Sequence, residues 1–191
     1  MFCQKWSEKL EKYRLLKIKN CRNFKIMKQN TCGALYTKKV LETFRNPHNY
    51  GKIKNADGIG KVGNIVCGDV MWLYIKVAKN KKGEDLIKDI KFETFGCVAA
   101  ISTSSIITDL VKGKTIKEAL EVTKDNVIES LGGLPKIKYH CSVLAVDALV
   151  EAIYDYFSKI GKKIPAGLQK RHEAIKKSKD IIEKRYEKWN K

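Results

Sequence analysis

Residues 65–77 read IVCGDVMWLYIKV, and from Met71 onward the side chains alternate in character. The apolar residues at 71, 73, 75 and 77 point to one side, and those at 72, 74 and 76 point to the other. This period of two is typical of a half-buried β-strand. A polar, glycine-bearing turn, KNKKGED, follows, and residues 86–95 (LIKDIKFETF) return as a second strand. The sequence therefore predicts an antiparallel hairpin at the centre of the fold.

Helical patterns flank this hairpin in the sequence. They are predicted over residues 37–44, 99–111, 115–120, 126–130 and 140–160. Asn46-Pro47 ends the first helix, because a residue before proline disfavours the helical conformation. Glycines at 51, 58, 60 and 63 are interpreted as turns. The fold class is α+β: a small antiparallel sheet of about three strands packed against several helices, with a long C-terminal helix.

Length and composition predict one domain with two extensions. Residues 1–33 are a basic N-terminal extension, residues 34–160 the central domain, and residues 161–191 a Lys-rich tail interpreted as a solvated helix. The 43% of hydrophobic residues can fill a core. No apolar run approaches the roughly 20 residues that a membrane-spanning helix needs, so we expect a soluble protein without a membrane span.

The net charge of +18 lies mainly at the two ends of the chain. Residues 1–30 carry nine Lys or Arg against two acids, and residues 161–191 carry eleven against four. This basicity predicts nonspecific attraction to polyanions at low salt. No nucleic-acid-binding motif accompanies it, so we expect no specific nucleic-acid partner.

The six cysteines are interpreted as free thiols, because the start of the chain lacks the apolar segment of a secretory signal. Cys3, Cys21 and Cys32 lie in the N-terminal extension and are assigned no role. We expect a cytoplasmic protein. The alternative is the matrix of a mitochondrion-type organelle, with residues 1–30 as a presequence, although Glu8, Glu11 and the shortage of Ser and Arg argue against it.

Three further thiols stand at the ends of predicted elements. Cys67 lies near the start of the first strand, two residues before Asp69, and Cys97 lies between the second strand and a helix. Cys141, preceded by His140, begins the long helix. The start of one hairpin strand lies beside the end of the other. Cys67 and Cys97 are therefore predicted neighbours, and all five residues meet if the long helix packs its N-terminus there.

These residue types suit a soft metal. Thiolates bind iron, iron–sulfur clusters and zinc, and helix N-termini together with Lys138 favour the thiolate form. The spacing is not the paired CxxC of a zinc ribbon or finger. Taken singly, each cysteine could instead be a small buried hydrophobic residue, Asp69 a turn cap and His140 a helix cap.

At these residues the sequence resembles the IscU/NifU-type iron–sulfur cluster assembly scaffold proteins, from about Tyr36 to Tyr156. The matching segments are YTKKVLETFRNPHNYG, GKVGNIVCGDVMWLYIKV, KFETFGCVAAISTSS, VKGKTIKEAL and LGGLPKIKYHCSVLAVDAL. The CGD, the FGC before a Ser-rich helix and the LPxxKxHCS occur together and in order, which makes the resemblance specific. No second cysteine-rich domain follows, so the chain resembles a stand-alone scaffold.

The resemblance implies a scaffold and not an enzyme. A partner cysteine desulfurase supplies sulfur as persulfide, iron binds, and a [2Fe–2S] cluster forms that is transferred to apo-proteins. Cys67, Cys97 and Cys141, with Asp69 or His140, would hold the iron and the cluster. Cys141 would be the persulfide acceptor, and Asp69 would loosen the cluster for release. Zinc is an expected occupant of the same ligands in the resting form.

The resemblance also implies partners. Tyr36 is implicated in pairing two scaffolds as a homodimer, and frataxin-like and ferredoxin proteins are expected partners. An Hsp70-type chaperone and its co-chaperone would recognise the segment made of Leu134, Pro135, Lys136, Ile137 and Lys138. The family usually has Leu-Pro-Pro-Val-Lys here, and loss of the second proline makes the segment less rigidly extended. Val98 replaces the family's glycine after the middle cysteine and adds bulk beside the site.

Three other functions fit the sequence less well. A zinc-binding, SufU-type sulfur relay would use the same three cysteines and Asp69, but that group carries an insertion before the last cysteine and lacks a residue like His140. A metal-free interaction module would be expected only if the chelating residues had been lost. A conventional enzyme is disfavoured because no triad, second carboxylate or glycine-rich phosphate loop stands out.

Overall fold

The computed structural model describes residues 35–64 and 68–189, with side chains described up to residue 181. Its elements belong to one compact unit, Tyr36–Lys191. In chain order they are α2 (Lys38–Arg45), β1 (Gly58–Asn64), β2 (Asp69–Lys79), β3 (Asp85–Phe95), α3 (Val98–Val111), α4 (Ile116–Leu120), α5 (Lys124–Ser130), the 3-10 turn η2 (Lys136–Lys138), α6 (Tyr139–Lys159) and α7 (Ala166–Trp189).

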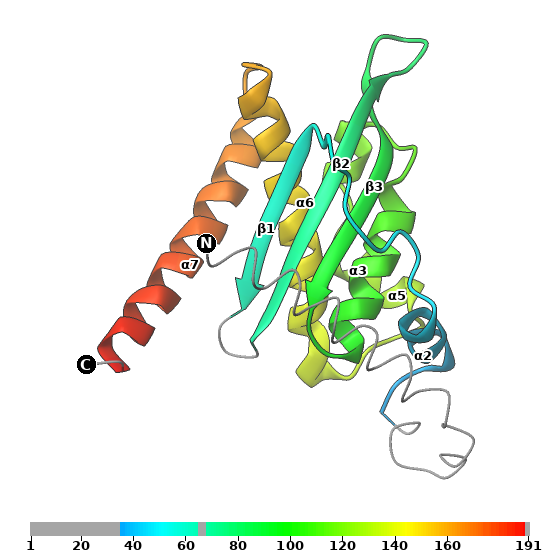
Figure 1. Ribbon diagram of the computed structural model, residues 1–191, viewed down its shortest axis with the longest axis vertical. Coiled ribbons are helices and arrows are strands. Elements are labelled where there is room, and N and C mark those ends of the chain that lie inside the picture. The colour runs from blue at the N-terminus through cyan, green and yellow to red at the C-terminus, as the bar shows by residue number, and fades with distance from the viewer. Residues whose placement is uncertain (1–34, 65–67, 190–191) are drawn as a thin grey trace. The chain divides into compact units, whose positions relative to one another are not determined.

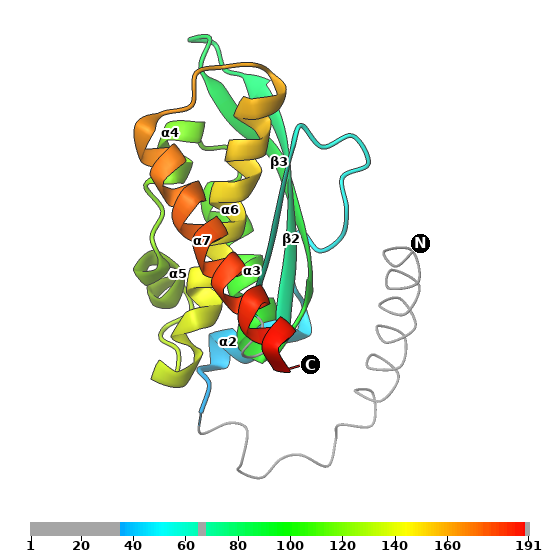
Figure 2. The ribbon, with the colours of Figure 1, turned by 90° about the vertical axis from the view of Figure 1, so that its left-hand side faces the viewer.

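The three strands form one antiparallel sheet in the order β1-β2-β3. Helices α3 and α6 lie against one face of this sheet, and α7 crosses α6 obliquely on the side where β1 is the edge strand (Figures 1 and 2). Within the described residues, no helix has the length and apolar character needed to cross a membrane. The predicted α+β class, with a three-stranded antiparallel sheet and a long helix on the C-terminal side, is confirmed.

The predicted hairpin is formed by β2 and β3. Met71, Leu73 and Ile75 are buried, as their alternation predicts. They pack in the core with Ile90 and Phe92 of β3. The regular register shifts at a bulge between Lys76 and Val77, and Val77 is less buried than Met71, Leu73 and Ile75.

The prediction of turns at Gly58, Gly60 and Gly63 is wrong, since all three lie within strand β1. The reason is the close approach of α6. A Cβ atom on Gly60 would overlap the carbonyl oxygen of Ala148, and one on Gly58 would overlap that of Ala152. Here glycine serves contact between two backbones and not a turn.

Replacing Gly60 by alanine is therefore expected to lower the free energy of unfolding by about 2–3 kcal/mol, because the helix backbone cannot move aside. Gly63→Ala is the matched control on the same strand. Its Cβ would lie 3.2 Å from a side-chain carbon of Val70, so we expect a loss below about 1 kcal/mol. Urea unfolding followed by circular dichroism measures both. Equal losses in the two variants would contradict the packing argument.

Helix α3 is held in place by buried hydroxyl groups. Ser102 donates a hydrogen bond to the carbonyl oxygen of Val40 in α2, and Thr103 donates to that of Cys141 in α6. Ser104 contacts the sulfur of Met71 in β2. Each hydroxyl is satisfied although it is buried. The Ser- and Thr-rich stretch therefore joins α3 to three neighbouring elements, including the start of α6.

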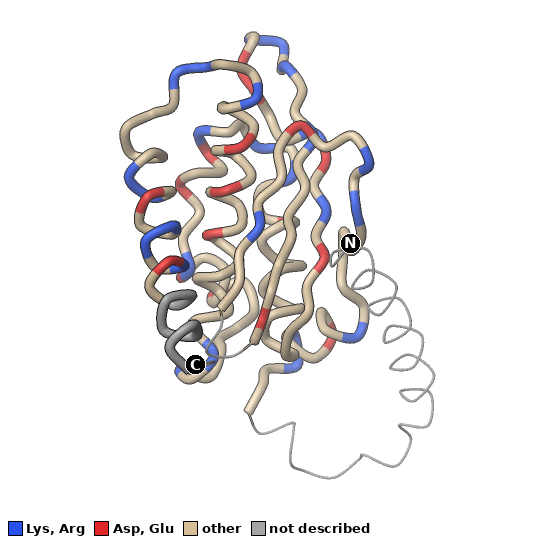
Figure 3. The backbone as a smooth tube through the Cα atoms, turned by 60° about the vertical axis from the view of Figure 1, so that its left-hand side comes forward, with Lys and Arg blue, Asp and Glu red and all other residues tan. Residues whose placement is uncertain are grey.

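The C-terminal tail is a helix, but it is not solvated on all sides. Leu168 of α7 is buried, and Arg171 donates a hydrogen bond to the carbonyl oxygen of Leu120. The ring of His172 stacks on Tyr154 of α6, with 3.7 Å between ring centroids, and bonds to Glu151 at 2.8 Å. Figure 3 shows basic and acidic residues interspersed along α7. Because lysines are frequent along the whole helix, the sequence did not indicate that one face of α7 is packed.

Candidate functional site

Three elements bring the predicted site residues to one end of the sheet. Asp69 is the first residue of β2, Cys97 is the N-cap of α3, and His140 and Cys141 lie in the first turn of α6. Val70 pairs with Phe95 across the hairpin. This register places the start of β2 beside the end of β3, and so Asp69 beside Cys97.

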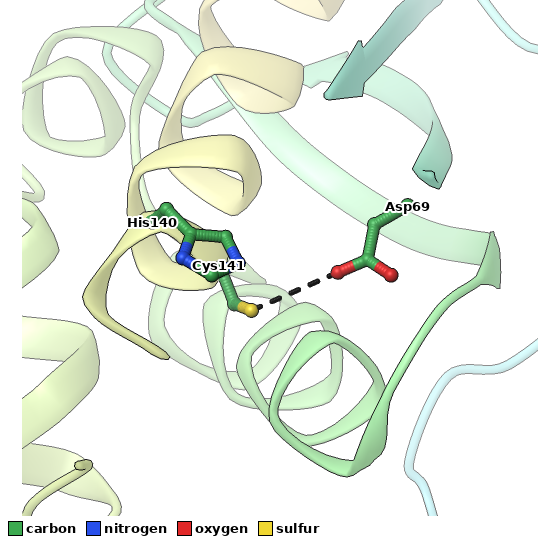
Figure 4. A group of neighbouring side chains, drawn as sticks. All are labelled: Asp69, His140 and Cys141. Carbon is green, nitrogen blue, oxygen red and sulfur yellow. Dashed lines mark hydrogen bonds between the residues drawn. The ribbon is translucent and has the colours of Figure 1, made fainter. Parts of the chain in front are cut away.

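The sulfur and oxygen atoms of this group are in near contact. The Sγ atoms of Cys97 and Cys141 are 3.8 Å apart, and they lie 3.9 and 3.8 Å from Oδ2 of Asp69. Ligand atoms of Asp69, His140 and Cys141 all lie within 4.8 Å of one another. Figure 4 shows these three side chains and the contact between Cys141 and Asp69. Two atoms that each lie about 2.3 Å from a tetrahedral metal are about 3.8 Å apart. The spacing therefore fits a shared metal.

Of the five predicted site residues, the structure brings four together. The fifth, Cys67, lies outside the described residues, between Asn64 at the end of β1 and Gly68. Its predicted proximity to Cys97 stays a prediction. In the sequence it precedes Asp69 by two residues.

His140 contributes a buried nitrogen atom that is not satisfied within the described residues. Its Nε2 has no hydrogen-bond partner there. The residue does not act as a helix cap, since the N-cap of α6 is Lys138 and makes no side-chain capping bond. An unsatisfied buried polar atom is unfavourable by roughly 1–3 kcal/mol. A bound metal at Nε2 would relieve this cost.

The pKa of the Cys97 thiol is lowered from 9.0 to about 6. The largest cause is the hydrogen bond from the Cys141 thiol. The backbone N–H of Ala100 and the charge of Lys138 act in the same direction, while burial and the charge of Asp69 oppose them. The pKa of Lys138 is raised, first by the Cys97 thiolate. At neutral pH the pair therefore presents one thiolate that is ready to bind a metal.

We expect alkylation of metal-free protein by iodoacetamide to show a midpoint near pH 6 at Cys97. Below that pH the thiol is protonated and unreactive; at pH 7 the thiolate predominates by about ten to one. Peptide-resolved mass spectrometry over pH 5–10 measures this. Lys138→Gln is expected to raise the midpoint, because it removes a charge that favours the thiolate. A midpoint above about pH 8, as in an unperturbed cysteine, would contradict the expectation.

The segment Leu134–Lys138 runs directly into this site. Leu134 is buried, whereas Ile137 is 73% exposed. Lys136–Lys138 form a 3-10 turn, so this part of the segment is not extended. Tyr36 packs partly against the core, and its neighbour Thr37 donates a hydrogen bond of 2.6 Å to the carbonyl oxygen of Leu131.

Two further residues support the site and were missed in the sequence. Thr103 bonds to the carbonyl oxygen of Cys141 and ties the start of α6 to α3. Gly96 lies directly against the carboxyl group of Asp69. The glycine in the FGC segment was the available signal, but a glycine beside a predicted helix start is usually explained by the turn itself. Val98, predicted to add bulk beside the site, packs partly against the core.

Comparisons with known proteins find related sequences. A family model described as the NifU-like N-terminal domain matches residues 35–163. The chain is 58% identical over 146 residues to the iron–sulfur cluster assembly scaffold protein IscU 1 of Archaeoglobus fulgidus, covering 75% of this chain and 92% of that protein. It is 48% identical over 134 residues to the mitochondrial iron–sulfur cluster assembly protein 1 of Debaryomyces hansenii, covering 69% and 73%.

A solved structure shares the fold. It is that of a putative iron–sulfur cluster assembly scaffold protein for the SUF system from Fervidobacterium islandicum AW-1. The match has a TM-score of 0.52 and 24% identity, and it covers 64% of this chain and 99% of the other. At this identity the likeness concerns the fold alone.

Proposed function

Because the chain belongs to the NifU-like N-terminal domain family, we propose that it is a scaffold on which a [2Fe–2S] cluster is assembled and from which it is passed to apo-proteins. The observation that carries the proposal is the contact of two thiols and a carboxylate at 3.8–3.9 Å, beside an imidazole nitrogen that has no hydrogen-bond partner in the described part of the chain. The cluster is the cargo of the protein and not a resident cofactor.

The ligand roles follow from the chemistry of the donors. Thiolates are the usual ligands of iron–sulfur clusters. Cys97 offers a thiolate at neutral pH, and Cys141 lies beside it as a second sulfur ligand. Cys67 would supply the third. Asp69 or His140 would complete the set, and iron would enter between them.

Cys141 is proposed to accept persulfide from a partner cysteine desulfurase. Its Sγ atom lies in the first turn of α6, which has no acidic residue in that turn to oppose a negative charge. The partner breaks the carbon–sulfur bond of free cysteine, and the scaffold receives the sulfur. In this division of labour the scaffold itself is not an enzyme.

Further partners would meet the exposed residues around the site. Ile137 and the 3-10 turn of the segment Leu134–Lys138 are exposed enough for an Hsp70-type chaperone and its co-chaperone to bind. Frataxin-like and ferredoxin proteins, recipient apo-proteins and a second scaffold paired through Tyr36 complete the proposed set. The cytoplasm is the proposed compartment. A mitochondrion-type matrix is the alternative, because one relative is named as mitochondrial.

The second candidate function is a zinc-dependent sulfur relay. The spacing of Cys97, Cys141 and Asp69 also fits tetrahedral zinc. His140 argues for the scaffold, because a relay site made of three cysteines and Asp69 would leave Nε2 of His140 without a partner among the described residues.

Anaerobic reconstitution tests the proposal. The full chain is incubated with ferrous iron, cysteine and a cysteine desulfurase, and is followed by visible absorption and Mössbauer spectroscopy. Sulfide-to-iron charge-transfer bands and the Mössbauer doublet of a [2Fe–2S] cluster are expected, and alanine at position 67, 97 or 141 should remove them. Tight zinc binding with persulfide on Cys141, and no cluster, would instead establish the relay.

A further inference from the structure

We propose that Gly96 is a positioning residue for Asp69: the absence of a side chain at position 96 leaves the space in which the Asp69 carboxyl group reaches the two thiols. The inference rests on the proposed function in one respect only, namely that Asp69 is a ligand. It assigns to the middle of the Phe95-Gly96-Cys97 segment a role distinct from that of the cysteine.

The steric observation is direct. A Cβ atom on Gly96 would lie 3.0 Å from both Cγ and Oδ1 of Asp69, and 2.7 Å from the Cβ atom of Ala100. Contacts this short require a neighbour to move. Ala100 belongs to the first turn of α3 and has no flexible side chain that could move aside. The carboxyl group of Asp69 is the movable neighbour.

Asp69 is confined on its other side as well. It is 5% exposed, and its Oδ2 faces the Sγ atoms of Cys97 and Cys141. Oδ1 is the oxygen that meets position 96. Any side chain at position 96 would therefore rotate or displace the carboxyl group and alter the distances from Oδ2 to both sulfur atoms.

Glycine at this position is not explained by backbone conformation. Gly68, on the other side of Asp69 in the chain, has φ = 72° and nothing within 4 Å of a Cβ position. Gly68 is required by its left-handed conformation. Gly96 does not have a positive φ. Glycine is needed at this position because neighbouring atoms leave no space for a Cβ atom.

A set of full-length variants isolates the contact with Asp69. Ala100→Gly removes the other obstacle, the Cβ atom of Ala100, and serves as the reference. Gly96→Ala is then added to that reference, with and without Asp69→Ala. Two properties are measured: the midpoint of thermal unfolding of the metal-free protein, and the visible absorption of Co²⁺ added anaerobically as the only metal.

In the reference background we expect Gly96→Ala to lower the unfolding midpoint by about 4 °C or more, and Asp69→Ala to restore at least half of that loss. The Co²⁺ bands of the Gly96→Ala variant should shift to the positions seen with Asp69→Ala. Adding Gly96→Ala to Asp69→Ala should shift them no further, because the affected ligand is already absent.

Two results would each overturn the inference. One is a loss of stability that is the same with and without Asp69; the other is a Co²⁺ spectrum that Gly96→Ala leaves unchanged. If Gly96→Ala prevents folding, restored folding on adding Asp69→Ala supports the inference and continued failure overturns it. The unfolding measurement uses no metal. Its outcome is thus separate from that of cluster reconstitution, and failure of the scaffold function would appear in reconstitution instead.

Discussion

Serine in place of Cys141 is expected to abolish cluster assembly, so that no sulfide-to-iron charge-transfer absorption develops during anaerobic reconstitution. The substitution changes one atom, but a serine hydroxyl is neither a persulfide acceptor nor a soft ligand for iron. It also removes the thiol that contacts Sγ of Cys97 at 3.8 Å. Since that thiol is the largest cause of the lowered pKa of Cys97, the substitution weakens a second ligand as well.

Cys32→Ser is the matched control, because it makes the same change at a cysteine with no assigned role. Urea unfolding of both variants should show that neither loses its fold, as serine is slightly smaller than cysteine and Cys141 lies in the first turn of its helix. A normal yield of cluster on Cys141→Ser protein would exclude Cys141 both as persulfide acceptor and as an essential ligand.

Asp69→Ala is expected to lengthen the half-life of cluster transfer to an apo-ferredoxin by about tenfold. The carboxylate is a hard, exchangeable ligand beside soft sulfur atoms. Without it, His140 is free to take the fourth position, since its ligand nitrogen lies within the same 4.8 Å group. Imidazole binds iron more firmly than a carboxylate does in such a set. The transfer is followed by circular dichroism in the visible range.

Asp69→Asn serves as the comparison, because it keeps the size of the side chain and an oxygen atom but removes the charge. We expect its half-life to lie between those of the wild type and Asp69→Ala. A half-life that neither substitution changes would remove Asp69 from the release step, while leaving Cys97 and Cys141 as ligands.

The convergence of the site was predictable because it depends on strand pairing. The alternation from Met71 onward identified one strand and LIKDIKFETF identified its partner, and an antiparallel pair necessarily joins the start of one to the end of the other. This pairing predicts that Cys67 lies beside Cys97, and Asp69, two residues after Cys67, lies at the same end of the sheet. The start of α6 was less constrained, since a helix can pack at many positions along a sheet.

Strand β1 and the packed face of α7 could not be predicted, for related physical reasons. The three glycines of β1 have no side chains, so they carry no alternation, and only the nearby backbone of α6 explains them. In α7, Leu168 is buried and Ile175 packs partly against the core, while Arg171 bonds to Leu120 and His172 bonds to Glu151 of α6. These positions follow the helical spacing i, i+3, i+4, i+7, but only two of the four residues are apolar, and the many lysines around them obscure the pattern.

The glycines of β1 have a mechanical consequence for the ligands. Side chains usually separate the main chain of a helix from that of a sheet. At Gly60 and Ala148 the two main chains are in direct contact. That contact lies about two turns along α6 from Cys141 and four residues before the end of β1. The helix and the strand are therefore held rigidly together, with His140 and Cys141 on the helix and Asp69 on strand β2, which pairs with β1. We therefore expect the site to open for release of the cluster through movement of the ligand side chains and of η2. Sliding of α6 along β1 is not expected to contribute.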